Sequence, residues 1–299
     1  METVLVTGGT GQVGRELRKI LPNAIFVGSK DYDLTDCNAV AKMYRDIQPT
    51  IVIHSAAKVG GILDNIEHQV EYYSENILMN TLVVNGALKN NVKKFIGILS
   101  TCVYPDTVES YPMKEGVLHD GKPTSTNFSY GIAKRGMAVH IDAIREKHGL
   151  DYCYLIPCNL YGPYDKFDYR SHYVGALVSK IYDAKASGSR EIVLYGDGSP
   201  LRQFLYAKDL AVVISSMLQR NLYENFNIAT EENISIDSIA KIALDVLDCK
   251  DFSMRYDTSK PNGQYRKDVC IEKFRKEFPD FKFSSLEHGI VEVYNSLKI

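Results

Sequence analysis

The feature that most constrains this chain is a run of glycines that begins at its eighth residue. Gly8, Gly11 and Gly14 stand at a spacing of three, directly after the apolar residues 4–6. Between a strand and a helix, the first glycine makes a tight turn, the second lets a pyrophosphate approach the backbone, and the third lets helix and strand pack closely. Free N–H groups at the start of the helix then bind phosphate. The sequence therefore predicts a dinucleotide-binding unit rather than a glycine-rich connector without a ligand.

The rest of the first half alternates short apolar runs with helical stretches. We expect helices at 38–46, 67–89 and 130–147, and strands at 4–6, 24–27, 51–53, 94–99 and 153–157. This alternation is typical of βαβ units, and strands that are apolar throughout indicate a parallel sheet covered on both faces. The predicted fold class is α/β, a doubly wound parallel sheet of the Rossmann type with a smaller mixed α/β substrate lobe.

The second half of the sequence is less regular. Residues 162–175 are rich in Tyr, Asp and Gly and predict a loop, and residues 196–200 predict a turn. Helices are expected at 173–186 and 234–248, with a strand at 191–195. We place a domain boundary so that residues 1–162 form the dinucleotide-binding domain and residues 163–299 form mainly the smaller lobe. A segment near 205–230, with a strand at 226–229, is expected to return to the first domain.

Composition excludes several classes of protein. The 299 residues are 45% hydrophobic and 24% charged, which is typical of a globular chain and not of a disordered one or a coiled coil. A net charge of −2 provides no basic surface for nucleic acid. No apolar run approaches the ~18 residues of a membrane span, and the amino terminus enters a strand without a basic segment, so we expect neither a membrane anchor nor an export signal.

The cysteines indicate the compartment. Six are scattered along the chain, and none forms a CxxC pair with the spacing of a metal site. Free, reduced thiols are therefore expected, in a cytoplasmic protein that binds no metal.

The end of the second expected strand bears on the choice of nicotinamide cofactor. A site for NAD often carries an acid there, which bonds the ribose 2′-hydroxyl. Here the strand runs into Gly28, Ser29 and Lys30, and the Lys30 cation would neutralise a 2′-phosphate, as would Arg15 if it reaches the site. The sequence favours NADP(H) over NAD, although Asp31 and another acid follow closely, and a solvated surface role for Lys30 is the alternative.

Tyr130 and Lys134 form a Tyr-x-x-x-Lys pair within an expected helix. Residues four apart lie on one helical face, and a lysine cation beside a phenol is expected to lower the pKa of the tyrosine. Such a tyrosine can act as a general acid. The pair is common by chance in a chain with 20 tyrosines, so its weight comes from Ser100, which follows the fourth strand. That hydroxyl would hold a substrate oxygen while Tyr130 protonates it.

Together these motifs resemble the extended short-chain dehydrogenases/reductases. The resemblance includes the glycine trio, the Tyr130–Lys134 pair and the strings at 54–57 and 159–163. Longer strings at 56–62, 100–105, 130–134 and 198–205, with the pairs at 171–172 and 266–267, resemble the GDP-L-fucose synthase family and its relatives that reduce GDP-4-keto sugars.

That resemblance implies an enzyme of GDP-sugar biosynthesis that uses NADPH to reduce the C4 keto group of a GDP-linked 4-keto sugar. Ser100 would bond the carbonyl, Tyr130 would supply the proton, and Lys134 would hold the ribose. Two further family residues, a cysteine and a histidine that epimerise C3 and C5, correspond to Cys102 and His172. A homodimer is implied, built on the helices at 67–89 and 130–147.

Binding residues follow from the same motifs. The expected cofactor residues are Gly8, Thr10, Gly11, Gln12, Val13, Gly14, Ser29, Lys30, Ala56, Ala57 and Lys134. The expected substrate residues are Lys58, Thr101, Asn159, Arg202 and Arg266, with the planar guanidinium of Arg202 as the diphosphate clamp. His54, at a strand end, is expected to be structural or to lie beside the cofactor.

Alternatives remain at the level of the sequence. Each of three expected site residues also has a role without function. Cys102 could be a small buried residue of the core, His172 a packed or surface histidine, and Arg202 a solvated surface arginine. The loop at 164–170 is more aromatic and basic than a fucose synthase requires, which fits a C4 reductase of another GDP-4-keto sugar, such as a heptose, with a separate epimerase.

Two further functions compete with these. An epimerase or dehydratase that retains its cofactor would not need Cys102 or the string at 58–61. A non-enzymatic NADP-binding regulator would be expected to lack Tyr130 or Lys134, and both are present.

Overall fold

A six-stranded parallel sheet organises the larger part of the molecule. The computed structural model describes residues 2–168 and 170–298. Neighbouring strands follow the order β10-β5-β4-β3-β1-β2, and every pair is parallel. The strands are β1 (Val4–Thr7), β2 (Ile25–Val27), β3 (Ile51–His54), β4 (Lys94–Ile98), β5 (Asp151–Pro157) and β10 (Phe226–Ile228). The predicted doubly wound sheet is confirmed, and the strand expected at 226–229 is present as β10 at its edge.

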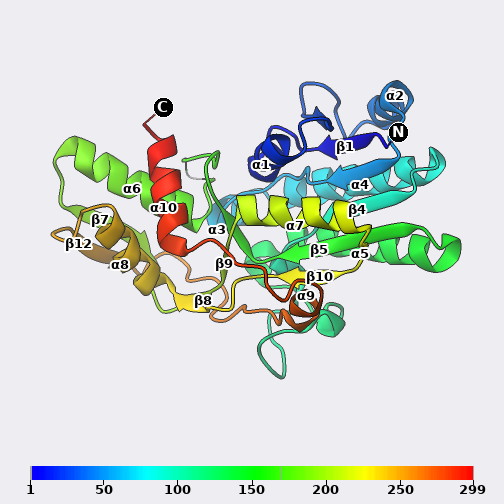
Figure 1. Cartoon of the computed structure of the whole chain (residues 1–299). Coiled ribbons are helices and arrows are strands. Elements are labelled where there is room, and N and C mark those ends of the chain that lie inside the picture. Colours follow the sequence, from blue (N-terminus) through cyan, green and yellow to red (C-terminus); the bar gives the residue numbers. More distant parts are fainter. Residues whose placement is uncertain (1, 169, 299) are drawn as a thin grey trace.

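Helices cover both faces of this sheet (Figure 1). On one face α1 (Gln12–Ile20) packs against α7 (Ala207–Arg220), and on the other α2 (Cys37–Ile47) and α5 (Phe128–His148) pack against α4 (Gln69–Lys89). This two-sided burial explains why the strands are apolar throughout, as in β3, where all four residues are buried.

The helix expected at 67–89 is present as α4, which begins two residues later, at Gln69. A separate short helix, α3 (Ile62–Glu67), precedes it. The break is at His68, whose backbone is not helical, with φ −119° and ψ 40°. His68 is held there by Asp64, because its amide donates to the Asp64 carbonyl at 3.0 Å and its ring Nδ1 lies 3.0 Å from the carboxylate.

A smaller lobe has its own hydrophobic core and lies at the left of Figure 1. Its core is formed mainly by α6 (Tyr173–Ser187), α8 (Ile236–Val246), α10 (Leu286–Ser296) and the parallel pair β7 (Glu191–Tyr195) and β12 (Ser253–Asp257). The expected helix at 234–248 begins later, at Ile236, because Ser235 caps it by accepting the Ser238 amide at 3.0 Å.

Short elements connect the two parts. The strand pairs are β6 (Asn159–Tyr161) with β9 (Phe204–Tyr206) and β8 (Leu201–Arg202) with β11 (Ile234–Ser235). The remaining helices are α9 (Glu272–Glu277) and the 3₁₀ turns η1 (Thr101–Val103), η2 (Glu115–Val117) and η3 (Ser125–Asn127). Within the described part of the chain, no helix combines the length and apolar character needed to cross a membrane.

Candidate active site

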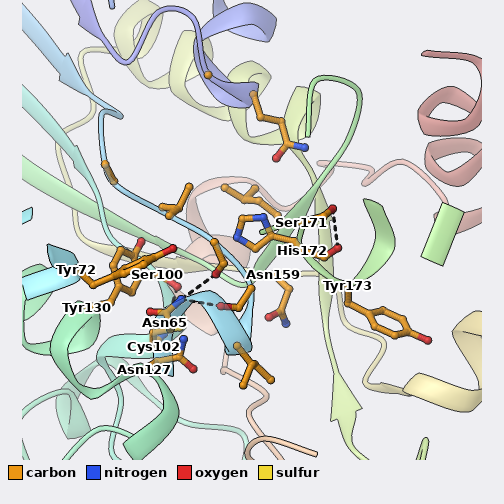
Figure 2. Close-up of a pocket in the computed structure, with 18 of the residues that line it drawn as sticks. Asn65, Tyr72, Ser100, Cys102, Asn127, Tyr130, Asn159, Ser171, His172 and Tyr173 are labelled. Atoms are coloured by element: carbon orange, nitrogen blue, oxygen red, sulfur yellow. Dashed lines mark hydrogen bonds between the residues drawn. The ribbon is translucent and has the colours of Figure 1, made fainter. Parts of the chain in front are cut away.

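A cavity of about 1190 Å³ lies outside the carboxyl ends of β1, β3, β4 and β5. Ligands of open α/β sheets bind at this edge. One end of the cavity is lined by the glycine turn after β1, and the other by α6 and the end of β7. Figure 2 shows Tyr72, Tyr130 and Ser100 toward one end of the view, Tyr173 toward the other, and His172 between them. The cavity therefore brings residues of both cores to one site.

The glycine turn has the geometry that a phosphate site requires. Gly8 has φ +73°, and a Cβ there would lie 2.7 Å from the Ala56 nitrogen. Gly11 begins α1 without a side-chain cap, so the first amides of the helix are left for an anion. Gly14 corrects one expectation: it does not line the cavity, because it faces the Gly8 carbonyl, 2.2 Å from an added Cβ. Its role is the close packing of helix on turn.

Other expected cofactor residues divide into two groups. Residues that line the cavity are Thr10, Gln12, Val13, Ser29, Ala56 and Ala57. Lys30 is exposed and does not line the cavity, so its expected contact with the cofactor stays a prediction. Arg15 is also directed elsewhere: its Nε donates to the Thr10 carbonyl at 3.0 Å and its guanidinium lies 4.8 Å from the Tyr164 ring centroid. The segment after β2 lines the cavity with Ser29, Asp33 and Thr35 instead.

Two of the expected substrate residues do not line the cavity. Lys58 does not line the cavity, because its ammonium pairs with Glu75 at 2.7 Å, and it is Glu75 that reaches the cavity wall. Thr101 is buried at the start of η1 and does not line the cavity. Its buried position leaves the neighbouring Ser100 and Cys102 side chains to face the cavity.

His54 is structural. Its Nδ1 lies 2.7 Å from the Thr7 hydroxyl and its Nε2 lies 3.1 Å from the Asn80 Oδ1. Asn80 also donates to the Ala133 carbonyl at 3.2 Å. Burial, with the nearby Lys134 charge, lowers the pKa of His54 to about 3, so the ring is neutral. The network ties β1 and β3 to the helix that carries Tyr130.

Tyr130, Lys134 and Ser100 all line the cavity. Lys134 is buried, its Nζ donates to the Ile98 carbonyl at 2.7 Å, and it lies 6.0 Å from the Tyr130 ring centroid. Burial lowers the pKa of Lys134 to about 7. Burial, followed by the charge of Cys102, raises the pKa of Tyr130. The direction is opposite to the expected lowering by Lys134, because desolvation is the largest cause of the Tyr130 shift and the Lys134 charge is not among its causes. Burial therefore favours the protonated phenol of Tyr130.

Tyr72 is a cavity residue that sequence reasoning missed. Its ring meets that of Tyr130 edge-on, with centroids 6.3 Å apart, and its hydroxyl donates to the Asp64 carboxylate at 2.6 Å. Gly60 makes room for this pair, since an added Cβ would lie 2.3 Å from the Tyr72 hydroxyl. No spacing in the sequence connects these residues.

Cys102 lies at the cavity wall beside a lysine that was not expected there. The Lys267 ammonium donates to the Cys102 sulfur at 3.0 Å, and both residues line the cavity. Arg266 does not line this cavity, because its guanidinium is held by Asp268 at 2.6 Å. Arg266 lines a neighbouring pocket that shares residues 261–264 with this cavity, so its expected role in substrate binding stays a prediction.

His172 lies on the loop before α6, whose backbone it caps. Its Nδ1 is 3.6 Å from the Asp165 carboxylate, which also accepts the His172 amide at 3.3 Å and the Ser171 hydroxyl at 3.2 Å. Burial acts to raise the pKa of Asp165, but these contacts outweigh it and the pKa is lowered. Gly61 lets the loop approach, since an added Cβ would lie 2.7 Å from the Ser171 carbonyl oxygen. The Gly61 amide also donates to the Arg170 carbonyl at 2.9 Å. Tyr169, part of this aromatic loop, lies outside the described residues.

Arg202 and Asn159 line the cavity as expected. Asn159 donates to the Gln203 carbonyl at 2.8 Å, which fixes its amide. Arg202 donates to the Leu201 carbonyl at 2.7 Å, and burial lowers its pKa to about 10, so the guanidinium remains charged. Among the described residues, no group of three or more His, Cys, Asp or Glu could hold a metal ion.

A glycine turn after the first strand of a doubly wound sheet, with Ser100 and the Tyr130–Lys134 pair in the same cavity, is the arrangement of an extended short-chain dehydrogenase/reductase. Residues 4–229 match the model of the NAD dependent epimerase/dehydratase family, and the chain belongs to that family.

Individual relatives narrow this similarity. The chain is 34% identical to the probable GDP-L-fucose synthase of Drosophila melanogaster, over 97% of this chain and 95% of the relative. It is 35% identical to the GDP-L-fucose synthase of Dictyostelium discoideum, over 97% and 93%. The crystal structure of a GDP-L-fucose synthetase from Naegleria fowleri bound to NADP aligns with a TM-score of 0.89 at 34% identity, covering 99% of this chain and 92% of that one.

Proposed function

We propose that this protein is an NADPH-dependent reductase of the C4 keto group of a GDP-linked 4-keto sugar. The observation that carries the proposal is the juxtaposition of Ser100, Tyr130 and Lys134 with Cys102 and Arg202 in one cavity. The first three suit carbonyl reduction, and Arg202 suits a diphosphate. The GDP-L-fucose synthase relatives, similar along nearly the whole chain, support GDP as the carrier of the sugar.

The cavity residues that follow β1 and β2 suit NADP(H). The Gly8 turn and the uncapped start of α1 provide amides for a pyrophosphate. Ser29 lines the cavity directly after β2, and the acid that follows in the lining, Asp33, already accepts hydrogen bonds from the Thr35 amide and hydroxyl. The NADP-bound relative from Naegleria fowleri supports the same choice. When bound, this cofactor supplies the hydride.

In the proposed reduction, three side chains position the substrate carbonyl and supply its proton. The Ser100 hydroxyl donates a hydrogen bond to the C4 oxygen, and the protonated Tyr130 gives that oxygen its proton. Lys134, anchored to the Ile98 carbonyl, is placed beside Tyr130 to hold the ribose hydroxyls. Burial favours the neutral phenol of Tyr130 over its anion, so the acid stays protonated until the alkoxide forms.

We further propose that Cys102 and His172 exchange the protons at C3 and C5 before reduction. Both line the cavity, each beside an ionisable side chain: Lys267 at 3.0 Å from the sulfur, and Asp165 at 3.6 Å from the imidazole. A C4 ketone acidifies the adjacent carbons, so a base and an acid at this position could invert them. This favours the bifunctional reaction over a C4 reductase that depends on a separate epimerase.

We also propose which residues bind each ligand, that the protein is a homodimer, and that it is cytoplasmic. Residues 1–162 would bind NADP(H) and residues 163–299 mainly the GDP-sugar. A homodimer is supported by Val70, Tyr73 and Leu78 of α4 and Val139 of α5, large apolar side chains that are 45–75% exposed on two helices packed together. A second copy of the same pair would complete a four-helix interface. Six free cysteines suit the reducing cytoplasm.

One reaction tests the activity. The protein is mixed with NADPH and GDP-4-keto-6-deoxymannose in D₂O, NADPH absorbance is followed, and the product is analysed by NMR. We expect NADPH consumption, with deuterium at C3 and C5. The Tyr130→Phe variant, which lacks only the acidic proton, should bind NADPH but react about 10²–10⁴-fold more slowly.

The other outcomes of this reaction separate the alternatives. Reduction without deuterium at C3 and C5 would make the protein a plain C4 reductase. No NADPH consumption would exclude this hexose and move the test to GDP-4-keto heptoses. Failure with both sugars would leave the non-enzymatic NADP-binding role.

A further inference from the structure

Lys267 is a buried cation without a carboxylate partner in the described part of the chain. The residue is 7% exposed and its Nζ lies 3.0 Å from the Cys102 sulfur. The adjacent carboxylate, Asp268, is taken by Arg266 at 2.6 and 3.0 Å and by the Asn233 amide at 3.0 Å. A buried ammonium is costly unless an anion or several acceptors compensate it. The group in position to do so is the thiolate of Cys102.

The surroundings of Cys102 favour that thiolate. The charged and titratable groups that face its sulfur are Lys267, Arg202 and Tyr130, and Tyr130 is neutral. Burial acts to raise the pKa of Cys102, but the Lys267 ammonium, with hydrogen bonds from Ser100 and Lys267 and the Arg202 charge, lowers it overall. Cys158 is the contrast: burial raises the pKa of its thiol to about 12. The Lys267 charge acts on both thiols, but its ammonium donates a hydrogen bond to Cys102, where the pKa is lowered overall.

We propose that Cys102 and Lys267 form a thiolate–ammonium pair in the resting protein, with Lys267 as the positioning residue that keeps Cys102 deprotonated. The pair itself needs no substrate. Its use as a base rests on the proposed function. The thiolate takes a proton from a carbon beside the C4 ketone: the C–H bond breaks, an S–H bond forms, and the electron pair becomes the enolate. The negative charge moves from sulfur to substrate while Lys267 stays an ammonium.

Thiol titration tests the pair without any sugar or NADPH. In a Cys37→Ser background, which removes the exposed thiol, iodoacetamide labelling of Cys102 is followed by mass spectrometry from pH 5 to 10. Absorbance of the thiolate at 240 nm gives a second reading. We expect Lys267→Met to raise the apparent pKa of Cys102 by at least about one unit, a tenfold smaller thiolate fraction at neutral pH. Lys267→Arg should restore the low value.

Controls separate this effect from a structural one. Lys58→Met removes a half-buried lysine that pairs with Glu75 instead and should leave the Cys102 titration unchanged. Circular dichroism reports whether Lys267→Met folds, and the arginine variant tests the pair if it does not.

An unchanged titration in Lys267→Met would overturn the proposal, and so would loss of GDP binding in that variant without a shift of the thiol. Because the assay contains no sugar, its result stands whether or not the protein reduces a GDP-4-keto sugar.

Discussion

Replacing Lys134 by methionine should change how the stability of this protein depends on pH. Lys134 is buried, with a pKa of about 7 against an ordinary value of 10.5. Between these values the unfolded chain holds a proton that the folded protein has released, so the free energy of unfolding rises with pH. A full proton contributes about 1.36 kcal/mol per pH unit. Allowing for partial protonation near neutrality, this side chain should add about 2.5 kcal/mol between pH 6 and pH 9.

The assay is urea unfolding at pH 6, 7, 8 and 9, followed by circular dichroism under reducing conditions. The quantity compared is the free energy of unfolding of wild type minus that of Lys134→Met, since other titrating groups such as Cys153 cancel in the difference. Methionine nearly matches the size of lysine and removes the charge, although it leaves the Ile98 carbonyl without its donor. That cost is the same at every pH.

Lys208 provides the control. It is exposed on α7, so Lys208→Met should give a difference that does not vary with pH. A flat difference for Lys134→Met, or one that falls with pH, would refute the reasoning, because Lys134 would then not be desolvated as an ammonium.

Two further changes test the packing and the assembly. Gly14→Ala would bring a Cβ within 2.2 Å of the Gly8 carbonyl, so it should cost about 1–3 kcal/mol of unfolding free energy and weaken NADPH binding in a fluorescence titration. Gly11→Ala, whose Cβ meets the same carbonyl at 3.3 Å, should lose clearly less, and equal losses would contradict the packing argument. If the proposed dimer forms through α4 and α5, Leu78→Glu should give a monomer in sedimentation velocity, whereas Ile25→Glu, also at an exposed apolar residue, should not. A monomeric wild type would refute the interface.

Local patterns in the sequence predicted most of the sheet and the first part of the site. The glycine trio, the apolar strands and the Tyr130–Lys134 spacing each lie within one βα unit or one helix. The geometry of each motif depends on the backbone of a few neighbouring residues, so it does not depend on the rest of the fold. Helix α7 was missed because its role is defined by α1, a partner nearly 200 residues away in the chain.

Tertiary structure decided which side chains reach the cavity. Lys30, Lys58 and Thr101 carry suitable chemistry in suitable motifs, yet none of them lines the cavity, because Lys30 is exposed, Lys58 is in an ion pair and Thr101 is buried. Lys267 stands next to the expected Arg266, and only the competition for Asp268 settles which cation is left for Cys102.

The pKa values also separate what the sequence predicts from what the tertiary structure decides. From the sequence alone, a lysine four residues from a tyrosine predicts attraction between charges. In the folded protein both Tyr130 and Lys134 are buried, so desolvation dominates: it raises the pKa of the phenol and lowers that of the amine. The sequence by itself determined the fold class and the dinucleotide turn, and it predicted Tyr130 as the acid. The protonation state of that acid, and the cation beside Cys102, depend on water exclusion and on long-range contacts, which exist only once the two cores have packed around the cavity.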